Sequence, residues 1–108
     1  MSIEAPRVVT ILSTTGATTT GGAYTPQGWP IKFLVSETGT GAITATVLIE
    51  VTNTVANAAS WVLGATVTLS GTTDVSDSFV TSGNWGNVRA RTTAISGTGA
   101  TVTVTMGY

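Results

Sequence analysis

The chain of 108 residues contains neither cysteine nor histidine. Without cysteine it can form no disulfide framework and offers no thiolate. Without histidine, imidazole metal sites and histidine-based acid–base catalysis are excluded. Charge is also scarce, because Asp, Glu, Lys and Arg make up 8% of the residues where soluble domains average about 25%. With a net charge of −1, the chain has no electrostatic reason to bind nucleic acid or an anionic membrane, and we expect neither partner.

Long apolar runs are missing as well. No uninterrupted apolar stretch approaches the roughly 20 residues that a transmembrane helix requires. The first seven residues lack the basic start and the apolar stretch of a secretory signal. We therefore expect a soluble protein, and the length suits a single domain, residues 1–108, with one hydrophobic core.

Threonine is the most conspicuous residue that is present. The chain has 24 Thr and 13 Gly, with frequent Val and Ile and few Leu, Glu, Lys and Arg. Side chains branched at Cβ fit a pleated sheet better than a helix. Disorder is excluded, because 42% of the residues are apolar and disordered chains have low mean hydropathy. The composition predicts an all-β fold.

Alternating apolar and polar residues mark seven stretches of this all-β chain. They are Arg7–Leu12, Ile31–Ser36, Ala42–Thr52, Trp61–Ser70, Val75–Thr81, Trp85–Ile95 and Ala100–Met106. Short strands separated by turns at intervals of 8 to 12 residues are typical of a sandwich. We therefore predict an antiparallel β-sandwich or jelly-roll-like barrel of about seven strands. The residues expected in its core are Val47, Ile49, Val51, Val67, Leu69, Val88, Ala90, Val102 and Val104.

Two glycine-rich features interrupt this pattern. Residues 13–30 form a long Thr/Gly segment after the N-terminal strand, longer than most loops of compact domains, which suggests a functional or partner-ordered segment. Residues 38–42 (TGTGA) and 96–100 (SGTGA) echo one another, and each precedes an alternating stretch. We interpret the echo as two similar hairpin turns, with a duplicated unit as the alternative.

The acidic residues give no clear catalytic or metal-binding pattern. Asp74 and Asp77 are close in sequence, but calcium needs six to eight oxygen ligands and glycosidases need two carboxylates at a set separation. Aspartates of this kind commonly bond nearby backbone amides, and we prefer that interpretation. A glycan-cleaving enzyme using Asp74, Asp77 and Glu37 is the rival hypothesis. We predict no enzymatic activity, no metal site and no cofactor.

Tryptophan and arginine supply the candidate contact residues. Arg89 and Arg91 share one face of a predicted strand, with Trp85 on the same side, and Trp29 lies in the long Thr/Gly segment. Because Trp and Arg dominate the energetics of protein interfaces, these four are the candidate partner or subunit contacts. The alternative for the arginines is a solvated pair that stacks on neighbouring threonines, or that pairs with Asp74 or Asp77. Trp61 is expected to anchor the core.

A series of short motifs runs through the second half of the chain. In order these are residues 60–63 (SWVL), 68–72 (TLSGT), 77–79 (DSF), Trp85, 88–91 (VRAR) and 95–104 (ISGTGATVTV). The series resembles small virion proteins of tailed bacteriophages, and the resemblance covers roughly residues 43–106. No catalytic residue comes with it, and the N-terminal third does not share it.

The resemblance implies a structural role in a virion. It suggests a capsid decoration (cement) protein on the outer shell, whose partner would be the major capsid protein or another virion protein. A tail- or fibre-associated module that recognises a host glycan or protein is the alternative. Scarce charge and a single lysine leave sheet edges unguarded, so we expect a homo-oligomer. A trimer is the form that decoration proteins of this kind suggest.

Overall fold

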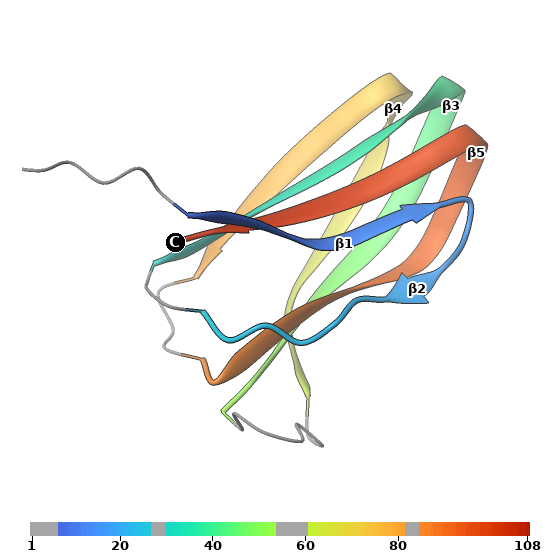
Figure 1. The fold of residues 1–108 in the computed structure, drawn as a ribbon. Helices are drawn as coiled ribbons and strands as arrows, with labels where there is room; N and C mark the ends of the chain where they lie inside the picture. The colour runs from blue at the N-terminus through green and yellow to red at the C-terminus, as the bar shows by residue number, and fades with distance from the viewer. Residues whose placement is uncertain (1–6, 27–29, 54–60, 82–84) are drawn as a thin grey trace, which may run out of the picture.

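The computed structural model describes residues 7–26, 30–53, 61–81 and 85–108, and it is all-β (Figure 1). The strands are β1 (Val8–Thr15), β2 (Thr19–Thr20), β3 (Ile31–Thr52), β4 (Val62–Thr81) and β5 (Asn87–Gly107). They form one antiparallel sheet in the order β1-β5-β3-β4, with β2 also paired to β5. In this part of the chain no helix is long and apolar enough to cross a membrane.

Three of these strands are unusually long and turn back on themselves. β3, β4 and β5 contain 22, 20 and 21 residues, and Figure 1 shows all three bending at the same end of the molecule. The bends fold the single sheet into two layers. We call the first layer β1 with residues 31–38, 74–81 and 101–107, and the second layer β2 with residues 42–52, 62–72 and 87–96.

Backbone geometry at the bends explains why the strands turn there. Gly41 and Gly97 have φ values of 75° and 127°, a region that residues with a Cβ rarely enter. On β4 the bend falls at Thr73, with a φ of 62°. The two echoing segments lie side by side, since Thr40 pairs with Thr98. They are therefore neighbouring bends within continuous strands, and their interpretation as hairpin turns was wrong.

The hydrophobic core lies between the two layers. On β3 alternate side chains are buried in both halves, from Ile31 through Val35 and from Ile43 through Val51. The inward rows of β4 and β5 meet them, and all nine residues predicted for the core are buried. Each such aliphatic side chain contributes roughly 1.5–3 kcal/mol when fully buried, so the inward rows hold the two layers together.

The prediction of an all-β fold is confirmed, but the described residues form five strands and not the seven predicted. The six predicted stretches after the first are the halves of β3, β4 and β5, so three predicted breaks are bends that keep their hydrogen-bonded neighbours. A glycine or turn residue marks a change of chain direction both at a bend within one strand and at a turn between two strands. Periodicity alone cannot distinguish a bend from a turn.

The Thr/Gly segment of residues 13–30 is less loop-like than expected. β1 extends into it as far as Thr15, and the chain then crosses to the second layer. There Thr19 and Thr20 pair with β5, the amide of Gly21 donates to the carbonyl of Ala90 at 2.8 Å, and Tyr24 bridges to Val88. The segment therefore lies along the edge of β5 that faces away from β3 in the second layer.

Candidate functional site

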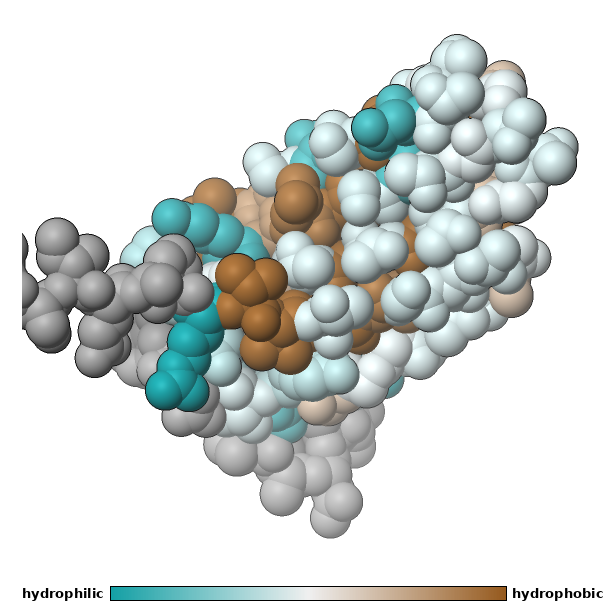
Figure 2. All heavy atoms as spheres, turned by 45° about the horizontal axis from the view of Figure 1, so that its top comes forward, coloured by the Kyte–Doolittle hydropathy of each residue, from teal (hydrophilic) through white to brown (hydrophobic). Residues whose placement is uncertain are grey.

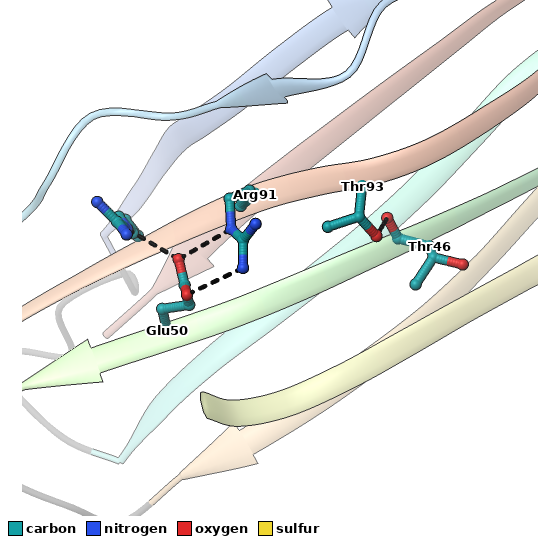
Figure 3. A network of polar contacts seen from close by, with 5 residues as sticks. Thr46, Glu50, Arg91 and Thr93 are labelled. Carbon is teal, nitrogen blue, oxygen red and sulfur yellow. Dashed lines mark hydrogen bonds and ion pairs between the residues drawn. The ribbon is translucent and has the colours of Figure 1, made fainter. Parts of the chain in front are cut away.

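A carboxylate between two arginines lies on the outer face of the second layer. Glu50 projects from β3 and Arg91 from β5, as Figure 3 shows, and Arg89 also belongs to β5. Nε of Arg89 donates to Oε1 of Glu50 at 2.9 Å, and Arg91 binds both carboxylate oxygens at 3.3 Å. Register brings the three together, because Glu50 is directly opposite Arg89 and its neighbour Leu48 is opposite Arg91. We call this group the Glu50 cluster.

Burial and charge act on Glu50 in opposite directions. Its side chain is 11% exposed, and burial, the largest single influence, raises the pKa of the carboxyl group. The hydrogen bonds and positive charges of Arg89 and Arg91 together outweigh burial, so the pKa is lowered below its ordinary value. Glu50 is therefore held as a carboxylate at neutral pH.

An aromatic ring completes the Glu50 cluster. The guanidinium carbon of Arg89 lies 4.3 Å from the centroid of Trp61, within the range of a cation–π contact. Trp61 therefore lies against Arg89 and not among the core residues, which corrects the expectation that it anchors the core. Arg89 and Arg91 form an ion pair whose acid is Glu50 and not Asp74 or Asp77. Their role as partner or subunit contacts stays a prediction.

The four candidate contact residues are not all brought together. Arg89 and Arg91 are neighbours in the Glu50 cluster. Trp85 packs against the hydrophobic core, and its indole N–H donates to the hydroxyl of Thr81 at 3.3 Å. Trp29 lies outside the described residues. Sequence reasoning missed Glu50 and Trp61 as cluster members, although the position of Glu50 on the polar side of an alternating stretch was a usable signal.

A shallow hydroxyl-lined groove adjoins the Glu50 cluster. It lies between β2 and β5, has a volume of about 300 Å³, and is lined by residues 18–20 and 91–93. Arg91, with 38% of its side chain exposed, contributes to both the groove and the cluster. Short hydroxyls beside a guanidinium can hydrogen-bond to a polyhydroxylated ligand.

A second hollow lies on the outer face of the first layer. It has a volume of about 500 Å³ and is lined mainly by apolar residues, among them Val8, Pro30, Leu34 and Tyr108. Val8 and Leu34 are 66% and 51% exposed. Figure 2 shows apolar side chains gathered close to the start of the chain, with a paler Thr- and Ser-rich surface extending away from them. We call this feature the apolar hollow.

The remaining acidic residues do not share a surface. Glu37 is 0% exposed and faces the core, where neither carboxyl oxygen has a hydrogen-bond partner among the described residues. Asp74 and Asp77 are exposed on β4, and Oδ1 of Asp77 accepts from the amide of Ser78 at 2.8 Å. That bond is the backbone contact expected of such aspartates. In the described part of the chain no group of three acidic residues could hold a metal ion.

No family model matches the chain, and comparison with curated proteins and with solved structures found no match.

Proposed function

We propose that the protein is a non-enzymatic structural component of a bacteriophage virion that binds the outer capsid shell as a decoration protein. Two kinds of support stand behind this proposal. The motif series of the second half of the chain resembles small virion proteins of tailed phages. The surface of the first layer has the character of a contact face, and this observation carries the proposal.

Short hydroxyl side chains cover much of the outer face of the first layer. Four neighbouring strands contribute Thr10, Ser13, Thr15, Ser36, Thr38, Ser76, Ser78, Thr101, Thr103 and Thr105. Short β-branched and hydroxyl side chains lose little entropy when they are covered. A regular face of this kind, with the apolar hollow at one end, suits packing against a rigid protein lattice, where the hollow supplies the desolvated centre that interfaces require.

The test is binding of purified variants to shells that lack the protein, read by co-sedimentation. Leu34→Asp places a charge in the apolar hollow at a side chain that is already 51% exposed, and we expect it to weaken binding at least tenfold. Thr44→Asp is the matched control, because it adds the same charge to the exposed outer face of β3 in the second layer. Equal binding by both variants would contradict a contact through the first layer.

Location on the particle is a separate question. Cryo-microscopy of intact virions should place density over the capsid faces. Density on the tail and none over the capsid would overturn the decoration proposal and favour the alternative, a tail- or fibre-associated binding module.

The Glu50 cluster is the observation that favours that alternative. Trp61, Arg89 and Arg91, with the adjoining groove of threonines, have the chemistry of a glycan contact. Glycan-array binding by the isolated protein, lost in Arg91→Ala and retained in Leu34→Asp, would support a binding module. The absence of any glycan signal with the unmodified protein would leave the decoration role as the better proposal.

A further inference from the structure

The outer edge of β4 is the longest open sheet edge in the described structure. β4 has 20 residues and, among the described strands, is paired with β3 alone. The edge runs through both layers, since β4 bends with the rest of the sheet. β1, at the opposite side of the first layer, has only 8 residues and a register shift between Thr10 and Leu12.

β4 has only some of the devices that normally protect an edge strand, namely two aspartates after the bend and a register shift at Gly64. Such strands are commonly guarded by lysine or proline, or are kept short, and β4 has no Lys and no Pro along its whole length. Of the five large apolar side chains that are exposed among the described residues, three belong to β4, namely Val62, Leu63 and Val80. Its backbone donors and acceptors and these side chains form a ready template for another strand.

We propose that a second copy of this chain pairs antiparallel with β4 about a two-fold axis at the bend, near Thr72. A two-fold axis there exchanges the two halves of the strand. Residues 63–70 of one copy then align with residues 74–81 of the other, and each layer continues into the opposite layer of the partner. A bent edge is matched best by an identical bend, which is why a second copy fits better than a straight peptide.

The distribution of charge agrees with this arrangement. Both charged residues of β4, Asp74 and Asp77, lie after the bend, and residues 62–72 carry no charge. The two-fold pairing places each aspartate beside the uncharged half of the partner. An alignment of like halves would place aspartates opposite one another, which is unfavourable across strands.

This contact joins two copies and leaves no β4 edge free for a third, because a two-fold interface uses the same surface on both partners. It therefore replaces the trimer as the expected state of the free protein, and it does not depend on where the protein lies in a virion.

The first test adds like charges across the proposed contact. In a register centred on Thr72, Thr68 is opposite Ser76 of the other copy, and both side chains are exposed. T68K/S76K therefore brings lysines together, and we expect the dimer dissociation constant, measured by sedimentation equilibrium, to rise at least tenfold. T10K/S13K is the matched control, with the same added charge on exposed sites of β1. A monomeric unmodified protein at high concentration, a trimer, or equal dissociation by both variants would overturn the proposal.

The second test uses the absence of cysteine from the chain. A residue at a two-fold axis lies next to its own copy, so T72C should form a disulfide-linked dimer under mild oxidation. T66C and S78C should cross-link efficiently when mixed and poorly when alone. Cross-linking of S13C as readily as T72C, or of T66C to itself as readily as to S78C, would contradict the β4 contact.

Discussion

Two carboxyl groups on the same strand meet opposite surroundings. Glu37 and Glu50 both belong to β3, and both are buried, at 0% and 8% exposure. Glu37 faces the core from the first layer and finds no hydrogen-bond partner among the described residues. Glu50 lies on the outer face of the second layer between two arginines. Burial raises the pKa of Glu37, whereas the arginines lower that of Glu50.

The difference shows that hydrogen-bonding and charged partners, more than the degree of burial, decide whether a buried carboxyl group raises or lowers the stability of the fold. A buried polar group without a partner carries a desolvation cost of about 1–3 kcal/mol. The same group between two guanidinium groups recovers that cost through charge-assisted hydrogen bonds. Glu37 is therefore expected to weaken the fold and Glu50 to support it.

The largest expected effect comes from removing the charge of Glu50. Glu50→Gln keeps the shape of the side chain but leaves Arg89 and Arg91 facing each other without a carboxylate between them. We expect a loss of about 2 kcal/mol, below the value for fully buried pairs because both arginines are partly exposed. Urea unfolding at pH 7 measures it. Arg91→Gln keeps one ion pair and should cost less, and a larger cost for that control would contradict this account.

Replacing Glu37 should have the opposite sign. Glu37→Val exchanges an enclosed polar side chain for an apolar one of similar volume that suits a strand, and we expect a gain of about 1–2 kcal/mol at pH 7. Glu37→Gln is the control, because it removes the charge but leaves polar atoms without partners, and it should gain less. Destabilisation by Glu37→Val would indicate that the carboxyl group has a favourable partner.

The two carboxyl groups also predict opposite dependences on pH. The pKa of Glu37 is raised above its ordinary value of 4.5 in the folded state, so its contribution to stability is present below that pH and declines as pH rises through the folded-state pKa. The pKa of Glu50 is lowered, so its contribution is present above 4.5 and declines as pH falls. Unfolding free energies of each variant and the unmodified protein across this range should show the gain of Glu37→Val growing with pH and the loss of Glu50→Gln shrinking in acid. Parallel curves would contradict both assignments.

The inner surface of the fold was predictable from sequence to a large extent. Alternation along residues 42–52 identifies the inward row from Ile43 to Val51 because a strand exposes successive side chains to opposite faces. The continuity of the long strands was not predictable, because Gly41 and Gly97 would serve a hairpin equally well. Glu37 was also missed as a core residue, since a charged side chain on an apolar row is normally expected at the surface.

The side-chain contacts on the outer faces of the sheet were harder to predict from the sequence. Periodicity places Arg89 and Arg91 on one face, but it cannot say which acid of another strand lies opposite them. That depends on the register between β3 and β5, which shifts between Thr46 and Val47. The contact of Trp61 with Arg89 depends on the same register and on the start of β4, which lies directly after it.

The smallest expected effect tests the aromatic member of the Glu50 cluster. Trp61→Ala removes the ring that lies 4.3 Å from the guanidinium carbon of Arg89, and a partly exposed cation–π contact contributes about 0.5–1 kcal/mol. Trp61→Phe should retain much of that contribution, because it keeps a ring with a negative face. In a double-mutant cycle with Arg89→Gln, the loss from Trp61→Ala should largely disappear, since the ring then has no cation to contact. If the loss persists in the Arg89→Gln background, Trp61 acts through its packing alone and the Glu50 cluster ends at the two arginines.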